Sequence, residues 1–224
     1  MSLVDLARKI QSRIPVPVVA SAFEAFATAV DLAADSAVVC VLEGATVVTS
    51  ELRHRGFEAP AVINTKKRIF HLRHLQRLPG AGYPEVIRTV SALLEALPTA
   101  RMPPALVVNV TNAGRPVIVL MTKSALRPIT ITIADGAAEH RVAPNEFRVP
   151  AKDLGGTLAV LLQSDRFKIS PDLTEASALT SELGNLDAGT DWKESNGLSL
   201  AVCLASWWGE RMMPVPKIEF SMAG

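Results

Sequence analysis

Residues 26–43 place two apolar runs one after the other, with a single carboxylate inside the first run. The first run ends at Leu32 and contains Asp31, small and polar residues follow, and β-branched residues dominate the second run. Two such runs separated by a short polar segment are typical of a β-hairpin. We therefore expect strands at 26–32 and 37–42, with Asp31 directed toward the centre of a sheet.

A continuous apolar run at 105–110 predicts a second kind of strand. Strands that are apolar on both faces are usually central, parallel and covered by helices. Helical spacing precedes this run from Pro84 to Leu97, another helix opens at 111–116, and a β-branched strand follows at 129–133. This order predicts an α/β fold with right-handed crossovers. Further helices are expected after Pro150, at 173–186 and at 197–211, with an edge strand at 166–169.

Composition narrows the classes of function. The chain is 49% hydrophobic and 20% charged, which is globular, and only 5% aromatic, which disfavours a base-stacking surface. Its net charge of +1 gives no overall attraction to DNA or a membrane, so any basic surface must be local. Of the adjacent Trp207 and Trp208, one is expected in the core and one at the surface.

The remaining sequence signals favour a soluble protein of the reducing cytoplasm. Cys40 and Cys203 lie in apolar runs, which is typical of buried thiols rather than a structural zinc site. The first five residues lack a signal-peptide pattern, and no apolar run has membrane-spanning length, so no membrane partner is expected.

The expected domain organisation has three parts. Residues 1–25 form an N-terminal amphipathic arm and linker, which docks either on its own domain or on a partner. Residues 26–211 form the main domain, and 212–224 form a proline-containing tail.

The order of several motifs is specific enough to suggest a family. The motifs are Val-Asp-Leu-Ala at 30–33, His-Leu-Arg-His-Leu-Gln-Arg-Leu-Pro at 71–79 with Tyr-Pro-Glu at 83–85, Leu-Val-Val-Asn-Val-Thr-Asn-Ala-Gly-Arg-Pro-Val at 106–117, and the segments 149–163 and 198–208. Together they resemble the nuclease domain of the large terminase subunit of phages and gene transfer agents.

This resemblance implies a ribonuclease-H-like fold, in which a mixed five-stranded sheet is flanked by helices and carries a two-metal acidic site across its central strands. It also implies double-stranded DNA and phage packaging proteins as partners, and Mg or Mn as the metal of an active enzyme. The ATPase half of the terminase motor has no counterpart, because no Gly-x-x-x-x-Gly-Lys-Ser/Thr loop occurs, so no use of ATP is expected.

The chain departs from the family at two of three implied ligand positions. Asn109 stands where the family has Asp, and Ser-Asn-Gly-Leu at 195–198 stands where the family has His-Asp-Asp-Leu, which leaves Asn196. Only Asp31 keeps its acid. Two magnesium ions carry four positive charges and require mostly anionic oxygens. We therefore expect no tightly bound cofactor, at most one weakly held ion at Asp31, and a catalytically inactive or impaired protein that binds DNA or a packaging partner.

Two nearby acids offer an alternative. Asp35 follows Asp31 by four residues, and Glu194 precedes Asn196 by two. If they replace the missing ligands, the protein is a Mg- or Mn-dependent DNA endonuclease. Otherwise Asp35 is a turn residue and Glu194 lies on a solvated loop.

Basic residues supply candidate DNA contacts. Lys66, Lys67, Arg68 and Arg73 are expected either to line a phosphate-binding groove or to form a solvated face. Arg115, at a predicted helix start, either meets a phosphate or caps nearby carbonyls.

Overall fold

The computed structural model describes residues 19–32, 36–53, 61–98, 102–112, 114–184, 197–212 and 219–221. The amphipathic segment of the expected N-terminal arm lies outside these residues. The chain forms two compact units. The larger unit comprises residues 23–45 and 69–214, and the smaller one comprises residues 1–22, 46–68 and 215–224.

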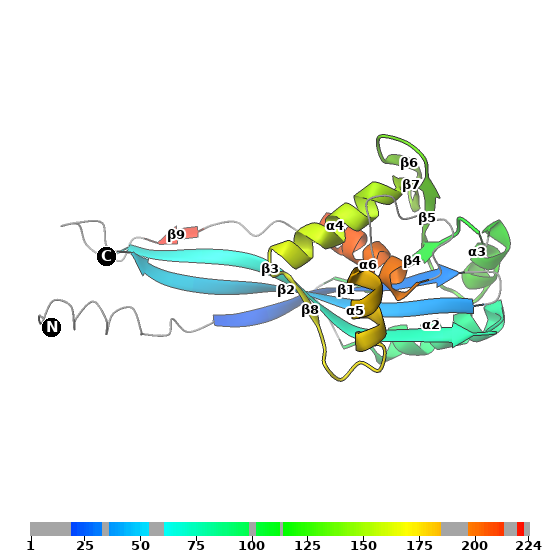
Figure 1. Ribbon diagram of the computed structural model, residues 1–224, viewed down its shortest axis with the longest axis horizontal. Helices are drawn as coiled ribbons and strands as arrows, with labels where there is room; N and C mark the ends of the chain where they lie inside the picture. Colours follow the sequence, from blue (N-terminus) through cyan, green and yellow to red (C-terminus); the bar gives the residue numbers. More distant parts are fainter. Residues whose placement is uncertain are drawn as a thin grey trace, which may run out of the picture. The chain divides into compact units, whose positions relative to one another are not determined.

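The described strands form one mixed sheet in the order β6-β7-β5-β4-β1-β2-β3-β8, and β9 pairs with β3 (Figure 1). The strands are β1 (Val19–Leu32), β2 (Ser36–Arg53), β3 (Ala61–Pro79), β4 (Ala105–Asn109), β5 (Ile129–Ala134), β6 (His140–Ala143), β7 (Glu146–Pro150), β8 (Phe167–Ile169) and β9 (Glu219–Ser221). In the smaller unit, the antiparallel pair of β9 and β3 joins Phe220 to Ile63.

The centre of the sheet has the predicted mixed character. β4 pairs in parallel with both β1 and β5, and β5 pairs in parallel with β7. β1 and β2 are neighbours separated by three residues, a connection too short for a parallel crossover, so β2 runs antiparallel to β1. The mixed sheet with helices on both faces confirms the predicted α/β class, and its five central strands lie in the order β3-β2-β1-β4-β5. Further strands extend the sheet on both sides.

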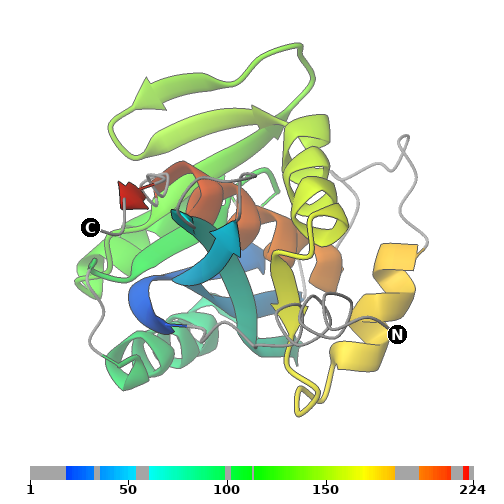
Figure 2. The ribbon, with the colours of Figure 1, turned by 90° about the vertical axis from the view of Figure 1, so that its left-hand side faces the viewer.

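Helices cover both faces of the sheet (Figure 2). On one face, α2 (Tyr83–Ala96) and α3 (Gly114–Lys123) pack against apolar side chains of β1, β2 and β4. On the other face lie α4 (Ala151–Gln163), α5 (Ala176–Gly184) and α6 (Leu198–Met212). Every residue of α6 from Leu198 to Gly209 is buried, as expected of a helix that is apolar on all sides. Among the described helices, none has both the length and the apolar character needed to cross a membrane.

The hairpin of β6 and β7 was not predicted, and it explains one error. Trp207 and Trp208 are only 4% and 8% exposed, so the expectation of one surface ring is wrong. Phe147 of β7 packs edge-on against both indoles, with ring centroids 5.6 and 5.8 Å apart. Arg211 stacks over Trp207 at 4.8 Å and pairs with Glu139 beside β6. The hairpin thus supplies the partners that bury the second ring.

Candidate functional site

Asp31 and Asn109 lie side by side on neighbouring parallel strands. Val30 of β1 is in register with Val108 of β4, and each of the two polar residues follows directly. Because side chains alternate along a strand, both point to the face that carries Ala29 and the α6 helix. Asp31 is 3% exposed and Asn109 2%, so the pair is sealed from bulk water.

The amide of Asn109 has one orientation. Its Nδ2 donates to Asp31 Oδ1 at 2.8 Å. Its Oδ1 accepts hydrogen bonds from the backbone N–H of Thr111 at 3.0 Å and from Thr111 Oγ1 at 2.6 Å. A backbone N–H can only donate, so the amide oxygen must face Thr111 and the NH₂ group must face Asp31.

Thr111 connects this pair to the next strand. Its Oγ1 accepts a hydrogen bond from the backbone N–H of Ile133 on β5 at 2.8 Å, while the hydroxyl hydrogen serves Asn109. A continuous set of hydrogen bonds therefore runs from β5 through Thr111 and Asn109 to Asp31 on β1. Every member is buried or partly buried, which makes each bond costly to remove.

Burial dominates the electrostatics of Asp31. Loss of solvent raises the pKa of its carboxyl to about 6, against the opposing effect of hydrogen bonds from Asn109 and from the backbone of Leu32. The carboxylate is thus largely ionised at neutral pH. Among the described residues, no group of three or more His, Cys, Asp or Glu side chains is arranged to hold a metal ion.

The first turn of α6 points toward the Asp31 end of β1. Cys40 Sγ donates to the carbonyl oxygen of Ala201 at the end of this first turn, and it also contacts the backbone of Ala29 on β1. Trp208, near the end of α6, lies instead beside the earlier β1 residues 25–27. The implied third ligand position, Asn196, and the substitutes Asp35 and Glu194 fall outside the described residues.

A carboxylate from α5 occupies the start of α6. Glu182 Oε2 accepts a hydrogen bond from the backbone N–H of Ser199 at 3.0 Å, and its other oxygen pairs with Arg77 of β3. An anion at this end of a helix is stabilised by the unpaired N–H groups and the helix dipole. Glu182 therefore supplies negative charge at the amino end of α6.

The candidate DNA contacts are divided between the two units. Lys66, Lys67 and Arg68 belong to the smaller unit, and each already interacts with other residues. Arg73 belongs to the larger unit and forms an ion pair with the buried Glu43 at 2.6 Å. Arg115 is exposed at the start of α3.

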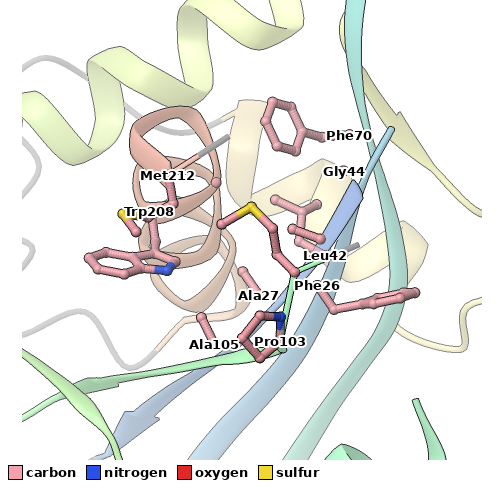
Figure 3. Close-up of a pocket in the computed structure, with 12 residues that line it drawn as sticks. Phe26, Ala27, Leu42, Gly44, Phe70, Pro103, Ala105, Trp208 and Met212 are labelled. Atoms are coloured by element: carbon pink, nitrogen blue, oxygen red, sulfur yellow. The ribbon is translucent and has the colours of Figure 1, made fainter. Parts of the chain in front are cut away.

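An apolar pocket of about 140 Å³ lies elsewhere in the larger unit (Figure 3). Its lining includes Phe26, Phe70, Trp208 and Met212 and no acidic, basic or histidine side chain. The β1 residues at the pocket end at Ala27, four residues before Asp31, which is about 13 Å along a strand. The pocket is therefore separate from the polar pair.

Three residues of these arrangements were not singled out from the sequence. Thr111 directly follows the polar end of a buried strand, and that position was an available signal. Glu43 and Glu182 had none, because their partners Arg73, Arg77 and Ser199 come from distant segments.

Comparisons with known proteins give the following similarities. No family model and no curated protein matches the sequence. The structure is similar to the large terminase nuclease of thermophilic phage G20c with bound zinc, at 15% identity and a TM-score of 0.49 over 84% of each chain. It is also similar to the manganese-soaked terminase nuclease domain of human cytomegalovirus, at 13% identity and a TM-score of 0.49, covering 92% of this chain and 94% of that one. The G20c nuclease with bound cobalt gives 14% identity and a TM-score of 0.41, covering 72% of this chain and 86% of that one.

Proposed function

We propose that this protein is a relative of terminase nuclease domains that does not cut DNA and acts by binding double-stranded DNA or a packaging protein. The observation that carries this proposal is the orientation of Asn109, whose NH₂ group faces Asp31 at 2.8 Å. The motif order and the central strand order support the family relationship.

The donor set does not fit a metal pair. A cation beside Asp31 needs oxygen ligands, mostly anionic ones, but Asn109 presents a hydrogen-bond donor to that position. Turning the amide over would break both hydrogen bonds from Thr111 and would leave the carboxylate facing a second oxygen without a proton between them. Each lost buried hydrogen bond costs about 1–3 kcal/mol, which opposes a weakly held ion.

The pairing of one amide with one carboxylate also has a structural advantage in a protein that does not cut. Two carboxylates at 2.8 Å without metal would repel each other, whereas an amide donor stabilises the single buried charge. The replacement of the second acid by Asn109 is thus consistent with a fold kept for binding.

The decisive experiment measures cleavage and binding separately. Supercoiled plasmid is incubated with the protein in Mg²⁺ or Mn²⁺, and Asp31→Ala is the matched variant. We expect no cleavage that depends on Asp31, no metal binding by calorimetry, and a mobility shift of duplex DNA or of a packaging complex without divalent metal.

The opposite result defines the competing function. Nicking in Mn²⁺ that Asp31→Ala abolishes would make the protein an endonuclease. Asp35→Ala and Glu194→Ala would then identify its substitute ligands.

A further inference from the structure

The exposed side of α3 combines apolar and basic side chains. Val117 and Met121 are fully buried and attach the helix to the sheet. On the opposite side, Val119 is 52% exposed and Leu120 38%. Spacing by four residues places Val119 between the exposed Arg115 and Lys123 along one side of the helix.

The charge of this surface is entirely positive. No Asp or Glu occurs between Glu95 and Asp135, and α3 and the turn after it contribute Arg115, Lys123 and Arg127, all exposed. Within the described part of the chain these three side chains form no ion pair. Several other cations of the larger unit do, namely Arg73, Arg77, Arg166, Lys168 and Arg211.

A second exposed apolar helix surface provides a contrast. On α4, Val160 is 55% exposed and Leu162 41%. The neighbouring charges there are balanced, because Arg166 pairs with Glu210 at 2.8 Å and Lys152 is followed by Asp153. Exposed apolar side chains with balanced charge give no preference for a partner, so α4 serves as the control surface.

We infer that the surface formed by Arg115, Val119, Leu120, Lys123 and Arg127, here called the α3 surface, docks an acidic amphipathic segment of a partner protein. Nucleic acid would neutralise the three cations but would leave the two apolar side chains exposed to water. A purely apolar partner would bury the cations without counter-charges, which is costly. Carboxylates flanking a few large apolar side chains satisfy both requirements.

α3 begins at Gly114, five residues after Asn109, at the carboxyl end of β4. It covers the face of the sheet opposite to the one that carries the side chains of Asp31 and Asn109. Docking on the α3 surface therefore needs no metal at that pair. The inference rests on the proposed binding role, since it specifies one class of partner for it.

The test uses the full chain and synthetic peptides. The helical probe is about 15 residues long, with leucines at helical spacing and glutamates elsewhere, which is longer than the exposed side of α3. We expect binding with a dissociation constant on the order of 100 µM, as for a small interface, weakening as salt is added. Fluorescence anisotropy with a labelled peptide measures the affinity.

Variants separate the contribution of the basic side chains from that of the apolar side chains. Arg115→Glu with Lys123→Glu, and separately Val119→Ser with Leu120→Ser, should each weaken binding about tenfold or more. Val160→Ser on α4 changes an equally exposed valine and should leave the affinity unchanged. Because all of these positions are exposed, circular dichroism should show unaltered folds.

Four results would overturn the inference. The first two are that a peptide with serine in place of leucine, or one with lysine in place of glutamate, binds as tightly as the original peptide. The third is that no binding occurs at millimolar peptide. The fourth is that duplex DNA or phosphatidylserine-containing vesicles displace the peptide. The plasmid assay is independent of this one. Cleavage with intact peptide binding would refute only the non-cutting role, and the reverse pattern would refute only the α3 surface.

Discussion

Asn109 Nδ2 lies 2.8 Å from Asp31 Oδ1, across neighbouring parallel strands, and Thr111 fixes the direction of this hydrogen bond. Asn109 thus presents a proton donor to the carboxylate of Asp31. The electrostatic properties of the site follow from this contact, and substitutions of its members test them directly.

Asn109→Asp should destabilise the protein at pH 8. It would place a second carboxylate against ionised Asp31, and we expect the free energy of unfolding to fall by about 2–4 kcal/mol. The loss should shrink at pH 5, where a proton can be shared, and Mn²⁺ should raise the melting temperature of the variant more than that of the native protein. Asn109→Ala, which removes the donor without adding charge, is the control. An Asn109→Asp protein as stable as the native one at pH 8 would contradict the contact.

Stability should depend on pH through Asp31. Its folded pKa is about 6, above the ordinary value of 3.8, so the folded state binds the proton more tightly than the unfolded state. This contribution is fully present below pH 4 and is lost as pH rises through 6. Its size is about 3 kcal/mol, since one pKa unit corresponds to about 1.4 kcal/mol.

Asp31→Asn isolates that contribution. Its amide oxygen can still accept from Asn109, but no charge is buried. Guanidinium unfolding from pH 4 to pH 8 should show the variant gaining stability relative to the native protein as pH rises. Parallel curves for the two proteins would show that Asp31 does not titrate as described.

Thr111→Val should cost about 1–3 kcal/mol despite its nearly unchanged volume. The substitution leaves the backbone N–H of Ile133 without its acceptor and removes one of the two donors to Asn109. Thr111→Ser keeps the hydroxyl and should stay within about 1 kcal/mol of the native protein. Equal stabilities of the two variants in urea unfolding would show that the hydroxyl is not required.

Gly209→Ala should destabilise α6 although alanine is the better helix former. A Cβ at this position would lie 2.7 Å from Cε1 of Phe70, whose ring is 1% exposed and tightly packed. The expected overpacking cost of about 1–3 kcal/mol exceeds the helix-propensity gain of about 1 kcal/mol.

Two further variants test this explanation. Gly156→Ala in α4 meets no atom within 4 Å and should stabilise the protein by about 0.5–1 kcal/mol. Phe70→Leu combined with Gly209→Ala should cost less than the sum of the two single changes. Additive thermal shifts would argue against a contact between the two residues.

The sequence predicted the helices and strands in which the buried side chains form a clear apolar pattern. The apolar run at 105–110 and the stripe of Val86, Ile87 and Val90 became β4 and the inner side of α2. The hairpin of β6 and β7 was missed because the β6 residues are mostly exposed and carry no apolar alternation. A strand with little burial leaves a weak pattern.

The resemblance implies a site across the central strands, and Asp31 of β1 and Asn109 of β4 are hydrogen-bonded to each other there. The function of the two residues stays a prediction. The direction of the Asn109 amide depends on Thr111 and Ile133, which are brought together only when β4 and β5 pair. The roles of Asp35, Glu194 and Asn196 stay predictions.

Glu182 joins three elements through one carboxylate, since it belongs to α5, pairs with Arg77 of β3, and caps the first turn of α6. A displacement of α5 would therefore change the solvation of Arg77. It would also change the electrostatic potential at the start of α6. The position of α5 is therefore tied both to the ion pair of Arg77 on β3 and to the start of α6.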